Sequence, residues 1–169
     1  MTIFDVILLI LLGGFVLFGI WFGIIHTIGA IFGTFAGAFF AGLLYEPLGH
    51  WLTQIFGNPN LMRIFAFIFI FIIINRLIGF IFHIIDKIFK FMHKMPFLKT
   101  INSTIGGVLG FFEGLLVIGI SLFMIARFPI SEWFTGVLQT SSLTPWFIKT
   151  SGILQLMLPQ ILKNLEAVI

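Results

Sequence analysis

Two charged residues interrupt long apolar segments, and chemistry is most expected at these positions. Arg76 lies within the apolar segment from about Leu61 to Ile81, and Glu113 lies within the segment from about Ile105 to Phe128. An unpaired charge at the bilayer centre costs on the order of 3 kcal/mol by insertion scales, so such residues are usually paired or functional. Both lie within about two helical turns of the same end of their segments, so an ion pair is geometrically feasible.

Each charge also has a simpler interpretation. Arg76 can extend its side chain to the headgroups, and Glu113 can be protonated or reach a wet crevice. A role in transport or proton handling is the functional alternative. The sequence leaves pairing, headgroup contact and transport open.

A metal site is not expected. His83 and Asp86 are three residues apart on one helix face, but two ligands do not complete a zinc site. The other histidines, His26, His50 and His93, are not expected to converge on this pair. Cysteine is absent, which excludes thiolate ligands and disulfides.

Catalytic and nucleotide-binding motifs are also not found. The hydroxyls of Ser141, Ser142 and Thr144 have no histidine nearby in sequence to activate them, and they are typical of a cap or turn before Pro145. The Gly-Gly pairs lie in apolar helices, not in phosphate loops, and no nucleic-acid patch is present. We therefore predict no enzyme activity, no cofactor and no nucleic-acid partner.

The elements that must position these residues are membrane helices. Hydrophobic residues make up 60% of the chain and charged residues 9%, against about 25% charged in a typical soluble domain. No Lys, Arg, Asp or Glu occurs from Val6 to Leu44. That stretch is too long for one crossing of a slab about 30 Å thick, so it should cross, turn and cross back. The chain is predicted to be an all-α polytopic membrane protein.

Four crossings are expected. A turn near His26 and Thr27 separates the first two, and Pro47 should end the second helix between the interfacial aromatics Tyr45 and Trp51. Gly57 to Asn60 is a turn signal. The predicted crossings are about 3–25, 28–44, 61–81 and 105–128, which together form a transmembrane domain over residues 1–128.

A lysine cluster sets the predicted orientation. The segment 82–104 between the last two crossings carries most of the lysines, so we place it in the cytoplasm and both termini outside. Its first part is amphipathic and can lie in the interface, with its lysines toward anionic lipid headgroups. The lysines expected at the headgroups are Lys87, Lys90, Lys94 and Lys99.

The remainder of the chain, residues 129–169, is expected to form a helical tail on the external membrane surface. Pro145 and Pro159 interrupt it too often for a fifth crossing. Trp133 and Trp146 are typical of headgroup depth.

Small residues recur every four positions on three of the crossings, and residues four apart share a helix face. In lipid, such faces let helix backbones approach closely, either within one bundle or between protomers around a gate. We predict that the faces of the second and fourth crossings touch each other. The residues are Gly19, Gly23, Gly29, Gly33, Gly37, Ala41, Gly106, Gly110 and Gly114.

The order of these features resembles the colicin V production protein (CvpA) family over roughly residues 1–160. The resemblance rests on Asp5 before the first run, on Pro47 after the second, on Asn75 to Gly79, on Asn102 to Gly110 followed by Glu113, and on Ser142 to Pro145. It implies a bacterial inner-membrane protein linked to colicin V production and envelope homeostasis. It implies no known reaction.

Two functions remain as alternatives. The first is a non-catalytic membrane factor that supports toxin production or export through partner contacts, made by the basic segment 82–99 and the tail. The second is a small channel or solute transporter, which we expect to be oligomeric because four short helices enclose little space. The expected partners are the bilayer, a second copy of the chain, and a secretion or envelope protein.

Overall fold

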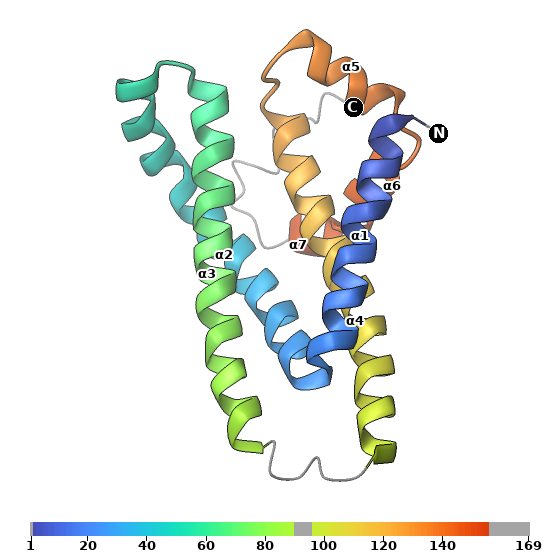
Figure 1. The fold of residues 1–169 in the computed structure, drawn as a ribbon. Coiled ribbons are helices and arrows are strands. Elements are labelled where there is room, and N and C mark those ends of the chain that lie inside the picture. The colour runs from blue at the N-terminus through green and yellow to red at the C-terminus, as the bar shows by residue number, and fades with distance from the viewer. Residues whose placement is uncertain (1, 90–95, 156–169) are drawn as a thin grey trace.

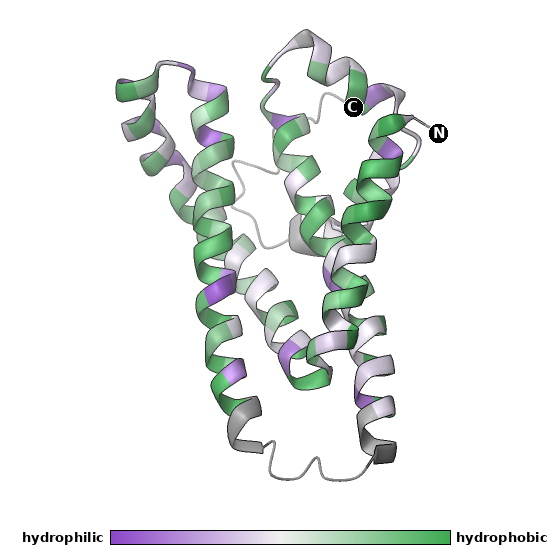
Figure 2. Cartoon of the chain, in the orientation of Figure 1, coloured by the Kyte–Doolittle hydropathy of each residue, from purple (hydrophilic) through white to green (hydrophobic). Residues whose placement is uncertain are grey.

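The computed structural model describes residues 2–89 and 96–155, and within them every regular element is a helix. The long helices are α1 (Ile3–Phe22), α2 (Ile24–Phe56), α3 (Pro59–Phe89) and α4 (Pro96–Arg127). Short helices follow: α5 (Glu132–Thr140), α6 (Thr144–Thr150) and α7 (Gly152–Gln155). The four long helices are long and apolar enough to cross a membrane. Figure 2 shows hydrophobic residues dominating them. The predicted all-α polytopic fold with four spanning helices is confirmed.

The long helices pair out of sequence order. α1 packs along α4, and α2 packs along α3, while the consecutive helices α1 and α2 make few contacts. Both pairs are antiparallel (Figure 1). The pairs are joined by α2 and α4, whose shared core contains Ala38, Ala41 and Tyr45 on one side and Ile120 and Met124 on the other.

The glycines of α4 face α1, which corrects the predicted contact between the second and fourth crossings. Gly106 lies against Gly19 and Gly23, and Gly110 lies against the carbonyl of Phe15. Because a Cβ at either α4 glycine would collide with backbone, the two helices can approach this closely only with glycine at both positions. The fourth-crossing stripe continues with Gly114, which packs on Leu12.

The glycines of α2 face α3 instead. Gly29 lies against Phe82, Gly33 against Asn75 and Gly37 against Phe71. In this seam Asn75 Nδ2 donates a 3.0 Å hydrogen bond to Thr34 Oγ1. The glycines of α2 and α4 therefore lie at contacts with α3 and α1, and not against each other as predicted. Ala41, the last member of the α2 row, lies in the core shared with α4.

The break between α1 and α2 comes at Gly23, not at the predicted turn near His26 and Thr27. Gly23 has a φ of 81°, a left-handed conformation that favours glycine. The first free N–H of α2, on Ile24, donates a 2.9 Å hydrogen bond to Asn102 Oδ1 of α4. The side chain of Asn102, from a helix distant in sequence, thus caps the start of α2. Only Gly23 separates α1 from α2, so there is no loop at His26 and Thr27.

Two other helix ends differ from the prediction. α2 continues through Pro47 to Phe56, because its second half is held against α3, where Gly49 lets the helix approach Arg63. α3 continues past the predicted end at Ile81 to Phe89, so residues 82–89 are part of α3 and do not form a separate helix. Contact of the lysine cluster with headgroups stays a prediction, because the side chains of Lys87, Lys90, Lys94 and Lys99 lie outside the described part of the chain.

The tail is only partly at the surface. α5 lies across one end of the bundle with Trp133 exposed, whereas α6 packs against α4 and buries Phe147 completely (Figure 1). Gly119 of α4 makes room for the Phe147 carbonyl and the Ser151 side chain. The expectation that the whole tail lies on the membrane surface is therefore wrong for α6. Residues 156–169 of the predicted tail lie outside the described residues.

One buried carboxylate connects the start of the chain to this tail. Asp5 of α1 is fully buried and accepts hydrogen bonds from Ser141 Oγ (2.6 Å), Leu143 N (3.2 Å) and Thr2 N (2.7 Å). The Thr2 hydroxyl in turn accepts a hydrogen bond from Asp5 N, which completes a capping box. The first helix and the tail are thereby fixed to each other.

Candidate functional site: a polar cavity between the helices

A cavity of about 980 Å³ lies among the four long helices. α2 and α4 contribute His26, Ala30, Glu113 and Val117, and the remaining lining comes from α1 and α3. Most of it is apolar. The lining residues are Leu11, Gly14, Phe15, Phe18, Phe22, His26, Ala30, Phe71, Ile72, Ile73, Asn75, Arg76, Leu77, Gly79, Phe80, His83, Glu113 and Val117.

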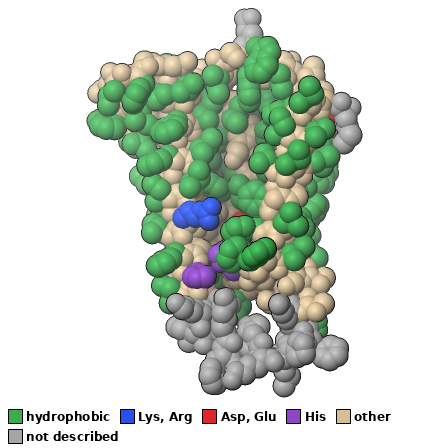
Figure 3. Space-filling view, in the orientation of Figure 1, with side chains coloured by type: hydrophobic (Ala, Val, Ile, Leu, Met, Phe, Trp, Pro, Cys, Tyr) green, Lys and Arg blue, Asp and Glu red, His purple; other side chains and the backbone are tan. Residues whose placement is uncertain are grey.

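The cavity opens sideways between α1 and α3. These two helices are not a closely packed pair, and several lining residues are also exposed on the outside of the bundle, among them Leu11 (50%), Leu77 (56%) and Phe80 (62%). Figure 3 shows Lys or Arg, Asp or Glu, and His side chains gathered on this face among hydrophobic ones. Because these helices span the membrane, the opening faces lipid.

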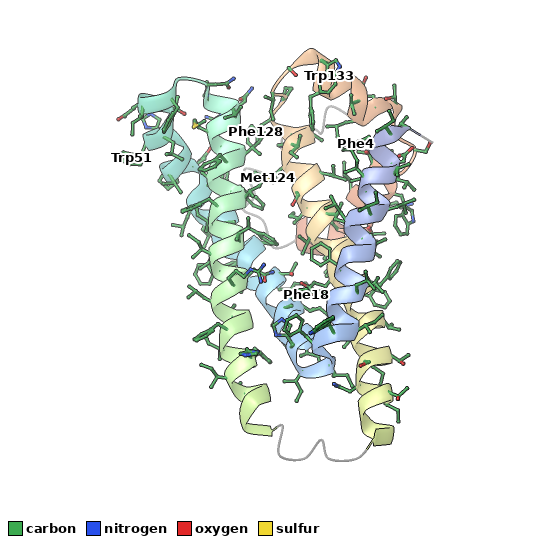
Figure 4. All side chains as sticks on the ribbon, viewed as in Figure 1. Phe4, Phe18, Trp51, Met124, Phe128 and Trp133 are labelled. Carbon is green, nitrogen blue, oxygen red and sulfur yellow. The ribbon has the colours of Figure 1, made fainter. Side chains whose placement is uncertain are left out.

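The end of the bundle nearer α5 is closed. Phe67, Tyr45, Met124 and Phe128 form a buried core there, and Arg63 stacks over the Phe128 ring at 5.6 Å. Figure 4 shows Met124 and Phe128 toward that end, and Phe18 lower down on the side of α1 that faces α3. The described helices therefore enclose a chamber that is blocked at one end. It is not a continuous pore through a single chain.

Arg76 and Glu113 both line this chamber. Arg76 is exposed at the α3 side of the opening, whereas Glu113 on α4 is only 8% exposed. The charge of Arg76 acts on Glu113 across the chamber, but within the described residues no direct ion pair joins the two side chains. The sequence predicted their shared neighbourhood, whereas the direct pair that it allowed does not form.

Both charges lie farther from the ends of their helices than the sequence predicted. α3 runs on to Phe89 and α4 begins at Pro96. Arg76 is therefore about 20 Å, and Glu113 about 26 Å, from those helix ends, at about 1.5 Å per residue. At these depths neither charge reaches the helix ends directly, so the chamber is their polar environment.

Two histidines line the same chamber, contrary to the prediction that the histidines stay apart. The ring of His26 from α2 and the ring of His83 from α3 are 6.2 Å apart in an edge-to-face arrangement. His26 also stacks on Phe22 at 4.6 Å. Among the described residues no third His, Asp or Glu joins them in a metal-binding group. Both imidazole rings therefore line the part of the chamber between Arg76 and the Phe89 end of α3.

Sequence reasoning missed three of the polar residues that matter here. His83 is seven residues after Arg76 and so on the same face of α3, which is a signal that could have been used. His26 gave no comparable signal, because its partner lies in a different helix far along the chain. In the sequence, Asn75 was recognised only as part of a motif. Its hydrogen bond to Thr34 holds α3 against α2 and so fixes the rotation of α3 at the neighbouring residue, Arg76.

Two glycines mark free space in the chamber wall. A Cβ added at Gly14 or Gly79 would meet nothing within 4 Å, and both residues line the cavity. Gly13 has equally open surroundings but does not line the cavity. The chain thus offers a matched pair of neighbouring positions, Gly13 and Gly14, for testing the chamber.

The family described as Colicin V production protein matches residues 4–152, which is most of the chain. No curated protein and no solved structure matches the chain. The matched range includes all four long helices, the chamber and the buried contact of Asp5 with the tail. The chain belongs to the colicin V production protein family.

Proposed function

We propose that this protein is a non-catalytic membrane factor that supports colicin V production, and that it works by binding a ligand in the chamber. The observation that carries the proposal is the chamber itself, which gathers Arg76, Glu113 and two histidines inside apolar walls open to lipid. Charged groups at such depth are costly unless they serve a function or find a partner. A bound ligand supplies that partner.

The lining favours binding over catalysis. The described residues around the chamber include no Ser, Thr, Cys or Lys that Glu113 or a histidine would activate as a nucleophile. The family description names a role in production and no reaction. We extend the role to envelope homeostasis at the bacterial inner membrane, with both termini outside, and to contact with a secretion or envelope protein through the segment 82–99.

A small transporter is the second candidate. A chamber that is blocked at one end and open along its side resembles a state with access from one side, which transporters with a central site adopt. A channel needs a continuous path across the membrane. Within one chain, the buried core around Tyr45 and Met124 blocks such a path. A channel would therefore require assembly of several copies.

The test fills the chamber without disturbing the helix seams. Gly14→Phe projects a ring into the chamber, while Gly13→Phe places the same ring one residue away, outside the chamber lining. In a colicin V-producing strain that lacks its own family member, the wild-type chain and G13F should restore toxin release, whereas G14F should reduce it at least about tenfold at equal membrane abundance. Equal activity of G14F and G13F would overturn the proposal.

Flux in liposomes separates the two candidates. Purified wild-type protein that moves solute under a pH gradient, with G14F inactive, would establish transport. Silence of the wild-type protein under tension, voltage and a pH gradient, together with full support of toxin release in cells, would leave the binding factor.

A further inference from the structure

We propose that the chamber holds the headgroup of an ethanolamine phospholipid that enters sideways from the bilayer, with its phosphate at Arg76 and its ammonium at Glu113. This inference rests on the proposed function, because it names the ligand of the same chamber. It follows from three observations: the lateral opening, the order of the two charges, and the chemistry of the polar lining.

The lateral opening lets a headgroup enter while the acyl chains stay in lipid. The gap between α1 and α3 is bordered by apolar side chains that line the chamber and also face outward, including Leu11, Phe18 and Leu77. Acyl chains lying in that gap lose no apolar contact. A soluble polar solute has no comparable reason to enter from this side, since it would have to cross hydrocarbon first.

The order of the charges matches the order within the headgroup. Arg76 is exposed at the opening, and Glu113 is recessed on α4. In an ethanolamine phospholipid the phosphate is joined to the acylated glycerol, and the ammonium lies beyond it. A lipid whose chains remain between α1 and α3 therefore presents phosphate to Arg76 first and ammonium to Glu113 behind it.

Both charges are available for such a ligand. Within the described residues neither Arg76 nor Glu113 has a direct ion-pair partner, and both line the chamber. An acidic lipid would satisfy Arg76 and leave Glu113 facing a second negative charge. A zwitterionic headgroup satisfies both side chains at once and adds no net charge to the membrane interior.

The polar lining favours a primary ammonium over a quaternary one. A carboxylate accepts hydrogen bonds, and an –NH₃⁺ group has three to donate. A choline headgroup has no N–H and is usually recognised by an aromatic cage, for which Trp is the best residue. The described lining holds Phe but neither Trp nor Tyr, and it places His26 and His83 in the same chamber as Glu113.

The experiment measures which lipid stays bound. The full chain is reconstituted in nanodiscs with equal amounts of ethanolamine, glycerol and choline phospholipids of identical acyl chains. It is then extracted into mild detergent, and retained lipids are counted by native mass spectrometry. For the wild-type protein we expect the ethanolamine lipid to exceed each of the others about tenfold, as for the loss of one charge-assisted hydrogen bond at Glu113.

Two substitutions assign the headgroup to the two charges. Glu113→Gln should remove the preference for ethanolamine over glycerol headgroups, and Arg76→Gln should lower retention of every phospholipid. Arg76→Lys, which keeps the charge, and Gly13→Phe, which lies outside the lining, should retain the ethanolamine lipid. Monodisperse elution of each variant shows that it is folded. A preference for glycerol or choline lipids, or retention unchanged in both E113Q and R76Q, would overturn the assignment.

Failure here is distinguishable from failure of the proposed function. If G14F stops toxin release while lipid retention ignores both charges, the chamber has another ligand and only this inference falls. If the ethanolamine lipid is retained through Arg76 and Glu113 while G14F supports toxin release fully, the lipid site stands and the proposed function falls.

Discussion

The seam between α1 and α4 and the gap between α1 and α3 use the same residue type in opposite ways. In the seam, Gly19, Gly106 and Gly110 bring two backbones into contact and exclude every side chain. In the gap, Gly14 and Gly79 touch nothing and leave space. Glycine thus closes one side of α1 and opens the other. A row of glycines in a membrane helix therefore marks a face without side chains. It does not indicate whether another helix packs against that face or whether the space stays open.

The largest expected effect comes from a side chain placed in the seam. Gly110→Leu drives its side chain into the Phe15 carbonyl and the neighbouring Gly19 backbone, which cannot move aside. Overpacking usually costs about 1–3 kcal/mol, and because backbone must shift here we expect a cost of more than about 3 kcal/mol. We expect G110L to lose most of its monodisperse peak in size-exclusion chromatography.

The matched substitution is Gly79→Leu, which adds the same side chain at a helix position with open space. It should give a peak like that of the wild-type protein and a similar thermal midpoint. If G79L is as damaging as G110L, the distinction between a filled seam and an open gap is wrong.

A second, smaller effect is expected at the buried contact between α1 and the tail. Asp5→Ala leaves the Ser141 hydroxyl and the Leu143 N–H without their acceptor in a fully buried place. Loss of a charged acceptor of this kind costs about 3 kcal/mol. Ser141→Ala should cost less, about 1 kcal/mol, because the other donors to Asp5 remain. The measurement is the free energy of unfolding in mixed micelles containing increasing SDS.

A double-mutant cycle tests whether these two residues act together. The loss in the combined variant D5A/S141A should be smaller than the sum of the two single losses, because the same hydrogen bond is removed once. Strictly additive losses would show that the hydrogen bond between Asp5 and Ser141 contributes no coupling free energy.

The sequence predicted the number and type of the helices but not their pairing. A charge-free stretch from Val6 to Leu44 and the turn at Gly57 to Asn60 are local signals, so the crossings could be placed. The partner of a glycine face is not a local property. The stripes of α2 and α4 have the same spacing, and nothing in either says that one meets Phe71 and Asn75 while the other meets Phe15.

The candidate site was predictable to the same extent. Arg76 and Glu113 stand out because a charge inside an apolar run is rare, and the structure brings both to one chamber. His26 does not stand out, since its place beside His83 depends on α2 and α3 forming a pair. Pro47 misled for a related reason. The helix-breaking effect of Pro47 can be read from the local sequence. The packing of Gly49 on α3, which keeps α2 helical beyond Pro47, depends on a distant segment and cannot.

A further small effect is expected where the filled and open sides of α1 meet, at the break before α2. Asn102 of α4 accepts the hydrogen bond of Ile24 N, and so holds the end of the seam and the start of the chamber wall in register. Asn102→Ala leaves that N–H unsatisfied and should cost about 1–2 kcal/mol of unfolding free energy. Asn102→Asp keeps an acceptor and adds negative charge at a helix N-terminus, where it is favourable, so N102D should match the wild-type protein. If N102D is as unstable as N102A, the amide donors of Asn102 matter and the capping account is wrong. If N102A is as stable as the wild-type protein, Gly23 alone sets the break, and the seam and the chamber are held independently.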